Sequence, residues 1–295
     1  MTNADNRIIA KMLANLLGPE LAKILHPSQK GFIPGRSGDD HIRDLNRKFY
    51  NAVKDKDKNS NLYVLFVDTK KAFDPIDHDY ILLLLKKIGF PVWICNLVRG
   101  LLSGARVNPI LGGSSDIWIP INRGVKQGCP LAPLLIALAN DPILTFLSTI
   151  DSLDTLAFAD DMALATTVFH DYHQAMNLIN DFRTATGLGI NTDKTTIMAA
   201  KGNDKQLAKL AAGSPWHDIK VVKSYVYLGI LIGRDIKVRE VFAKALQGFE
   251  TRASSYLPIV RKLSHAMRIL VFSTFLFTKL SYIMQYYSLP YGEGK

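Results

Sequence analysis

The sequence predicts an α+β protein, because helical and strand segments alternate without the regular strand–helix–strand period of a doubly wound sheet. Short apolar runs of strand length stand beside longer segments whose apolar residues recur every three or four positions. The chain has 295 residues, 48% of them hydrophobic and 21% charged. That length and composition allow a substantial buried core and are typical of a globular protein.

The N-terminal half is expected to alternate helices with one buried strand. Apolar periodicity, β-branched or aromatic runs, and capping or breaking residues at their ends define these elements. In order, we expect a helix over residues 7–25 that breaks at Gly18-Pro19, a loop at 31–38, a helix from Asp39 or Asp40 to about Val53, a solvated charged turn at 54–61, a strand over 62–68, a helix from Asp74 or Asp77 to Gly89, a helix from Val92 to about Ser103, and a hairpin at 105–121.

The C-terminal half is expected to carry a long apolar helix, an acidic hairpin and a basic helical end. The same signals define its elements. In order, we expect a helix from Leu131 to about Ile150, a hairpin over Thr155 to Thr167, an amphipathic helix from His170 to Thr186, strands near 196–198 and 221–227, and helices beyond, with Arg252, Arg261, Lys262 and Arg268 spaced along them.

Charge and cysteine content narrow the class of protein. A formal net charge of +10 and a pI near 9.5 favour a polyanionic partner such as nucleic acid. The two cysteines, Cys95 and Cys129, support neither a disulfide framework nor a structural zinc site. No apolar stretch reaches membrane-spanning length, and the N-terminus lacks a basic-then-apolar signal. We therefore expect a nuclear or cytoplasmic protein with no membrane partner.

The pair Asp160-Asp161 is the strongest chemical signal, because it interrupts the apolar segment 156–164. Two like charges about 4 Å apart repel by roughly 1 kcal/mol in water and by several times that near a protein interior. A divalent cation turns that repulsion into attraction. For the pair taken alone, a turn decorated with Asp is the alternative interpretation.

A second apolar strand, over 62–68, also ends in a carboxylate, that of Asp68. Mg²⁺ prefers oxygen ligands, keeps several waters, and typically binds one or two carboxylates plus substrate phosphates. A two-metal site holds the attacking and leaving oxygens of an in-line displacement. Together, the two strands indicate phosphoryl or nucleotidyl transfer.

Six short segments carry a family resemblance, and they occur in the family's order along the chain. They are QKGFIPGRS at 29–37, FVDTKKAFD at 66–74, GVKQGCPLAPLL at 124–135, FADD at 158–161, GLGINTDKT at 187–195 and YLG at 227–229. Together they resemble the reverse transcriptase domain of non-LTR (LINE-type) retrotransposons, from about residue 7 to 235. Six matches in order make chance similarity an inadequate explanation.

The resemblance implies a right-hand polymerase fold, divided into partial fingers at 1–61, a palm at 62–235 and the start of a helical thumb at 236–295. The palm would hold an antiparallel sheet flanked by helices, with inserted fingers elements at about 91–125. The implied activity is RNA-directed DNA synthesis, in which a primer 3′-hydroxyl is extended on an RNA template. The implied substrates and cofactors are dNTPs and two Mg²⁺ ions, with Mn²⁺ as an alternative. The oligomeric state stays open.

The same resemblance assigns roles to the acids and to one aromatic residue. Asp68 and Asp160 would bind the metal ions, and Asp161 would support the site or bind metal weakly. Phe73 matches the family's steric gate against a ribose 2′-hydroxyl; the alternative is a core aromatic. Gln127 and Gly128 would meet the template or incoming nucleotide, or would only form a helix-entry turn.

Basic and primer-contacting residues complete the implied site. Lys194 would act near the leaving pyrophosphate, although a surface lysine after a turn is equally ordinary. Arg36 could contact phosphate or template, or only be solvated in its loop. The segment Tyr227-Leu228-Gly229 resembles the primer grip.

Two departures from the family pattern motivate an alternative function. Family members usually carry an Arg-Pro-Ile-type fingers strand shortly before the stretch that resembles residues 7–25, and this sequence starts after it. The sequence also stops within the expected thumb. The alternative is a catalytically inactive remnant that only binds nucleic acid. Within the polymerases, an intron maturase-type or telomerase-like enzyme is a further possibility.

Overall fold

The computed structural model describes residues 4–57, 61–70, 74–104, 106–107, 118–126, 128–202 and 204–289. Phe73 and Gln127 therefore lie outside the described residues. The described chain forms two compact units. The first takes in the described residues of Met1–His41 and Ala52–Val222, and the second those of Ile42–Asn51 and Lys223–Lys295.

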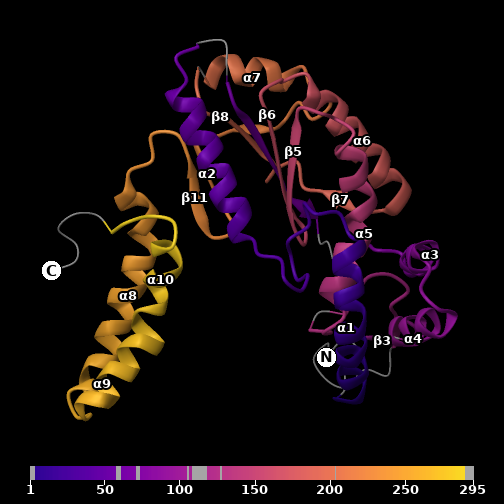
Figure 1. The fold of residues 1–295 in the computed structure, drawn as a ribbon, viewed down its shortest axis with the longest axis horizontal. Coiled ribbons are helices and arrows are strands. Elements are labelled where there is room, and N and C mark those ends of the chain that lie inside the picture. The colour runs from indigo at the N-terminus through magenta and orange to yellow at the C-terminus, as the bar shows by residue number, and fades with distance from the viewer. Residues whose placement is uncertain are drawn as a thin grey trace. The chain divides into compact units, whose positions relative to one another are not determined.

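The first unit contains most of the strands and the apolar helices (Figure 1). Its elements are α1 (Ala4–Ile24), α3 (His78–Ile88), α4 (Val92–Leu102), α5 (Ala132–Leu147), α6 (Asp171–Thr186), α7 (Asp204–Ala212), β1 (Tyr63–Val67), β2 (Thr69–Lys70), β3 (Arg106–Val107), β4 (Ile119–Pro120), β5 (Leu153–Phe158), β6 (Asp161–Thr166), β7 (Gly189–Ile190), β8 (Thr196–Ala199) and β9 (Lys220–Val221).

A five-stranded sheet in the order β5-β6-β1-β8-β9 organises this unit. The central strand β1 pairs antiparallel with β6 and β8, whereas β8 and β9 pair in parallel at the edge. The sequence of β1, YVLFV, is β-branched and aromatic, and four of its five residues are buried. The predicted α+β class and largely antiparallel central sheet are confirmed.

One face of the sheet packs against helices α5, α6 and α7 (Figure 1). Leu65, Leu164 and Ile197 come from three adjacent strands, and Tyr172 and Met176 come from α6. The Tyr172 hydroxyl is buried and donates a hydrogen bond to the Leu164 carbonyl oxygen at 3.0 Å. One face of the sheet is therefore covered by a packed apolar layer.

Helix α1 runs without interruption through Gly18-Pro19, so the predicted break is wrong. A proline disfavours the helical conformation of the preceding residue mainly through a clash with its Cβ, and glycine has none. A Cβ at Gly18 would also stand 3.1 Å from Cγ of Pro34. Gly18 therefore serves both the continuity of the helix and its close packing.

The strand predicted over 221–227 is also wrong, because two strands in different sheets occupy it. Residues Lys220–Val221 form β9 beside β8, and Ser224–Tyr227 form β10. The boundary between the two units falls at Val222. Neither helix α7 nor β11, the partner of β10, was predicted from the sequence.

The second unit consists of a hairpin and a helical arm, together with part of α2 (Asp39–Lys54). Its elements are β10 (Ser224–Tyr227), β11 (Ile230–Gly233), α8 (Val238–Val260), α9 (His265–Val271), the π-helical turn η1 (Phe272–Leu276) and α10 (Thr278–Met284). Helix α10 packs back against α8 (Figure 1). No single described helix is long and apolar enough to cross a membrane; only the bent pair His265–Leu276 and Thr278–Met284 passes, by length and composition.

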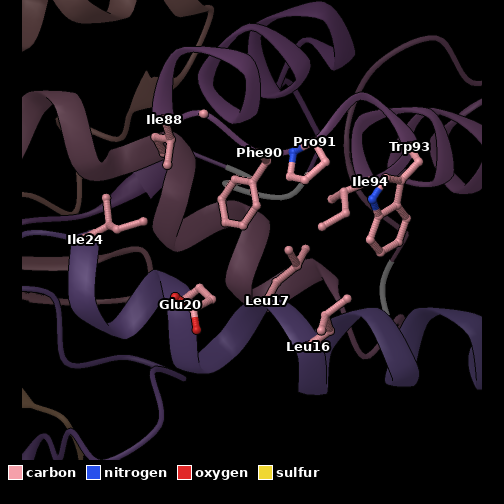
Figure 2. Close-up of a pocket in the computed structure, with 10 residues that line it drawn as sticks. Leu16, Leu17, Glu20, Ile24, Ile88, Phe90, Pro91, Trp93 and Ile94 are labelled. Atoms are coloured by element: carbon pink, nitrogen blue, oxygen red, sulfur yellow. The ribbon is translucent and has the colours of Figure 1, made fainter.

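An apolar cavity of about 340 Å³ lies between α1 and the α3–α4 corner. Figure 2 shows Leu17, Phe90 and Trp93 at its walls, with the carboxylate of Glu20 beside them. Glu20 is the one charged residue among those that line it. Because none of the predicted catalytic acids lines this cavity, it is not a candidate for the polymerase chemistry.

Candidate active site

A tight hairpin presents the acidic pair. Strands β5 and β6 pair up to Phe158 and Asp161, so only Ala159 and Asp160 form the loop. Ala159 has φ of 55°, as the first loop residue of a type II′ turn does, where glycine is preferred. An alanine in this region is strained, and strain of this kind persists only where surrounding contacts impose it.

Asp68 reaches the same place from the neighbouring strand. The β1–β6 pairing ends at Val67 and Met162, and one further step in that register places Asp68 opposite Asp161. The Thr69 hydroxyl donates a hydrogen bond to the Asp160 carbonyl oxygen at 3.0 Å. The structure therefore brings together the three predicted carboxylates at one end of the sheet.

The pKa of Asp161 reflects its partial burial and the proximity of the other two carboxylates. Its side chain is accessible to solvent, yet partial desolvation and the negative charges of Asp160 and Asp68 raise its pKa to about 6. Neighbouring carboxylates disfavour a further negative charge in this way. A bound cation would remove the repulsion and restore the ionised form.

The donor chemistry suits a hard divalent ion bound together with substrate. Among the described residues, no group of three His, Cys, Asp or Glu side chains is placed so that it could hold a metal ion by itself. Mg²⁺ is commonly bound by one or two carboxylates and completed by water and substrate phosphates. Asp68, Asp160 and Asp161 would hold such ions, and their mutual repulsion fits a site that needs cations.

The turn that carries Lys194 is bonded to the backbone of Asp68. The Asn191 N–H donates to the Asp68 carbonyl oxygen at 2.7 Å, and the Asp68 N–H donates to the Thr195 hydroxyl at 3.3 Å. The Thr195 hydroxyl in turn donates to the Asn191 carbonyl oxygen at 2.9 Å. Lys194 is exposed in this turn, so an ammonium group lies on the segment that is hydrogen-bonded to Asp68.

Gly128 lies just before α5, with φ of 80°. A Cβ there would meet no atom within 4 Å, so backbone conformation rather than crowding requires glycine. The open surroundings are compatible with the predicted nucleotide contact. The roles predicted for Phe73 and Gln127 fall outside the described residues.

Arg36 makes a structural contact that neither interpretation of the sequence anticipated. Its two terminal guanidinium nitrogens donate to the carbonyl oxygens of Ala22, Leu25, His26 and Gln29, at 2.7–2.8 Å. Ala22 lies in the last turn of α1, whose carbonyls lack partners within the helix, and basic side chains often cap such ends. The other three carbonyls follow the helix, and that of His26 also accepts the Gln29 N–H at 3.0 Å. The phosphate or template contact stays a prediction, while the observed bonds make Arg36 a helix cap.

The segment that resembles the primer grip is a second tight hairpin, in the other unit. Tyr227 pairs with Ile230, and the loop residues Leu228 and Gly229 have φ of 47° and 81°. Two positive φ angles in a two-residue loop are typical of a type I′ turn. The Tyr282 hydroxyl of α10 donates to the Leu228 carbonyl oxygen at 2.7 Å, which holds the turn against the helical arm.

Reasoning from sequence assigned no role to Gln29, Gly31 or Asn140, which support the acidic hairpin. Gln29 and Asn140 both donate to the Ala159 carbonyl oxygen, at 3.3 and 3.2 Å. A Cβ at Gly31 would stand only 2.2 Å from the Ala159 nitrogen. The contacts of Gln29 and Gly31 with Ala159 join residues more than a hundred positions apart, and that of Asn140 spans 19 positions. They leave no local periodicity in the sequence, so only the motif around Gln29 hinted at importance.

Comparison with known proteins identifies a family over most of the chain. The family model described as reverse transcriptase (RNA-dependent DNA polymerase) matches residues 1–232. A transposon TX1 protein of 149 kDa from Xenopus laevis is 25% identical over 293 residues, which cover 96% of this chain and 22% of that protein. A retrovirus-related Pol polyprotein from the type-1 retrotransposable element R2 of Popillia japonica is 32% identical over 176 residues, or 56% of this chain and 24% of that protein. The chain thus spans less than a quarter of the length of these two relatives.

The fold is similar to that of a solved telomerase. Telomerase from Candida albicans, solved with a TWJ fragment of telomeric RNA, superposes with a TM-score of 0.52. The match covers 97% of this chain and 48% of that one, at 11% sequence identity. At that identity the likeness concerns the fold alone.

Proposed function

The chain belongs to the reverse transcriptase (RNA-dependent DNA polymerase) family, and we propose that it carries out RNA-directed DNA synthesis at the site of Asp68, Asp160 and Asp161. Its similarity to TX1 and R2 proteins confirms the predicted resemblance to non-LTR retrotransposon enzymes. The relatives are much longer, so activity, substrates and partners of this chain are proposals.

The observation that carries the proposal is the meeting of three carboxylates at the end of two adjacent strands. Asp68 comes from the end of β1, and Asp160 and Asp161 come from the β5–β6 turn. The Thr69–Asp160 hydrogen bond and the raised pKa of Asp161 support their proximity. Carboxylates that repel one another at the ends of adjacent strands suit the binding of cations and of a polyphosphate.

Each residue of the site would have a distinct part in nucleotidyl transfer. Two bound Mg²⁺ ions, or Mn²⁺ in their place, would activate the primer 3′-hydroxyl and neutralise the leaving pyrophosphate. Asp68 and Asp160 would hold these ions, and Asp161 would add negative charge beside them. Lys194 would place its ammonium near the leaving pyrophosphate, for which a mobile point charge is suited.

We also propose an RNA template, a DNA primer and dNTPs as substrates. The net charge of +10 favours polyanionic partners. Gln127 and Gly128 would contact template or nucleotide, Phe73 would exclude a ribose 2′-hydroxyl, and the Tyr227-Leu228-Gly229 turn would hold the primer end. The division into fingers, palm and thumb, and the nuclear or cytoplasmic location, belong to the same proposal.

Primer extension tests the proposal. The full chain is incubated with a primed RNA template, Mg²⁺ and dNTPs, and Asp68→Ala and Asp160→Ala should each abolish extension. Asp151→Ala is the matched control, because Asp151 is exposed in the turn at the opposite end of β5. Extension that survives both catalytic substitutions would sink the assignment.

The same experiment separates the enzyme from an inactive binding remnant. A remnant would bind RNA or DNA in a salt-sensitive manner without metal-dependent incorporation of dNTPs. Wild-type extension that depends on Mg²⁺ and on Asp160 would exclude it.

A further inference from the structure

Gln29 is fully buried, at 0% exposure, beside the turn that carries the catalytic acids. The Ala159 N–H donates to Oε1 of Gln29 at 2.8 Å, and Nε2 of Gln29 donates to the Ala159 carbonyl oxygen at 3.3 Å. One carboxamide thus binds both peptide groups of a single residue. The Gly31 N–H also donates to Oε1 of Gln29, at 2.9 Å, which orients the carboxamide.

The backbone around Gln29 adds a short parallel bridge to β5. The Lys30 N–H donates to the Ala157 carbonyl oxygen at 2.8 Å, and the Ala157 N–H donates to the Ser28 carbonyl oxygen at 3.1 Å. Gly31 then passes so close to Ala159 that no side chain fits between them. The segment 28–31 is therefore joined to the hairpin by backbone hydrogen bonds and close packing.

The residue held in this way is the strained one. Ala159 adopts a positive φ that alanine disfavours, and it directly precedes Asp160. Because the carboxamide binds both its N–H and its C=O, it selects one backbone conformation at this position. That conformation decides where the next two side chains, Asp160 and Asp161, point.

We propose that Gln29 is a positioning residue for the reaction, which fixes the direction of Asp160 and Asp161 by clamping the peptide groups of Ala159. It acts through Ala159 and does not touch substrate. The inference rests on the proposed function of the acids, since positioning matters only if they are catalytic. Misplacement of a catalytic group by about 1 Å can cost on the order of 100-fold in rate.

The chain offers a matched control at the far end of β1. Nδ2 of Asn61 donates to the Lys201 carbonyl oxygen at 2.6 Å, and the Lys201 N–H donates to Oδ1 of Asn61 at 2.8 Å. This is the same two-bond clamp of a carboxamide on one residue, in the same unit but away from the acids. Gln29→Met and Asn61→Leu each replace the carboxamide with an apolar side chain of similar length, and so remove both hydrogen bonds of the clamp.

The first readout is single-turnover primer extension by the full chain, per folded molecule measured by urea unfolding. Gln29→Met should lower the rate at saturating primer–template by about 10- to 100-fold and raise the Mg²⁺ concentration for half-maximal rate, with the KM for primer–template unchanged. Asn61→Leu should stay within about threefold of wild type in all three quantities. Equal rates for the two variants would overturn the inference. If Gln29→Met does not fold, the shorter amide of Gln29→Asn replaces it in the same comparison.

The second readout does not depend on catalysis. Gln29→Met should remove hydrogen-exchange protection from the Ala159 amide and shift the amide resonances of Asp160 and Asp161, whereas Asn61→Leu should do neither. Unchanged protection at Ala159 overturns the inference even in a protein without extension activity. Asp160→Ala in the same assay separates the two claims: if it stays active, the proposed function fails, whatever Gln29 does.

Discussion

Replacement of Gly31 by alanine should disrupt the β5–β6 hairpin through a collision alone. The added Cβ would stand 2.2 Å from the Ala159 nitrogen, 1.2 Å short of the 3.4 Å at which ordinary contact begins, and 2.8 Å from the Phe158 carbonyl carbon. These are backbone atoms and cannot rotate away. The segment 28–31 and the hairpin must therefore separate by about the missing distance.

The expected cost combines overpacking with lost hydrogen bonds. Overpacking in a tight site costs about 1–3 kcal/mol. Separation would also weaken the bonds from Ala159 to Gln29 and from Lys30 to Ala157, each worth about 1 kcal/mol. Gly31→Ala should therefore lower the free energy of unfolding by about 2–5 kcal/mol, and reduce extension per folded molecule by on the order of 100-fold.

Urea unfolding and primer extension measure both effects, with Gly100→Ala as the control. Gly100 lies in α4 with nothing within 4 Å of its Cβ position. Alanine there should stabilise the protein by up to about 1 kcal/mol, because it is the better helix former. A Gly31→Ala variant that stays within roughly 0.5 kcal/mol of wild type and remains active would refute the expected collision between segment 28–31 and the hairpin.

Three further substitutions test other parts of the structure. Asp77 caps α3 by accepting the Asp79 N–H at 2.8 Å, so Asp77→Ala should cost about 1 kcal/mol in urea unfolding, and an unchanged midpoint would contradict the cap. Burial raises the pKa of Asp141 above the ordinary 3.8, so its contribution to stability is present below that pH and lost as the pH rises through the folded-state pKa. The amide oxygen of Asp141→Asn can still accept the His26 N–H, so the variant should differ mainly in charge. It should flatten the pH dependence of the free energy of unfolding above about pH 4, and an unaltered slope would contradict a raised pKa at Asp141. Tyr282→Phe removes the hydrogen bond to the Leu228 carbonyl oxygen and should lower the free energy of unfolding by about 0.5–1.5 kcal/mol, as calorimetry would measure. If that turn holds the primer, the variant should also raise the KM for primer–template in a primer titration. An unchanged free energy of unfolding would contradict the first expectation, and an unchanged KM the second.

The sequence predicted the strands at the acidic end of the sheet well, because strong local patterns encode them. The run YVLFV predicted β1, and the apolar residues around Asp160 predicted the β5–β6 hairpin. Both of these apolar segments are followed by acids, so the acids lie close together if the strands pair. The sequence did not specify the register; one step beyond the observed pairing of Val67 with Met162 places Asp68 opposite Asp161.

The parts that failed depend on long-range or unusual contacts. The continuity of α1 through Pro19 rests on the missing side chain of Gly18, which resembles a break when only local propensity is considered. The split between β9 and β10 follows from two separate units rather than from any residue pattern. The cap by Arg36 and the clamp by Gln29 are side-chain bonds to backbone atoms, which leave no periodic trace in sequence.

If Asp160 binds a divalent ion that the extension reaction needs, its replacement by a softer ligand should change the metal preference of the reaction. In Asp160→Cys a soft thiolate replaces a hard carboxylate, and thiolates favour softer ions over Mg²⁺. Primer extension by the variant should be lost in Mg²⁺ and partly restored by Cd²⁺ or Mn²⁺. Extension in Mg²⁺ at the wild-type rate would contradict the claim that Asp160 is a metal ligand.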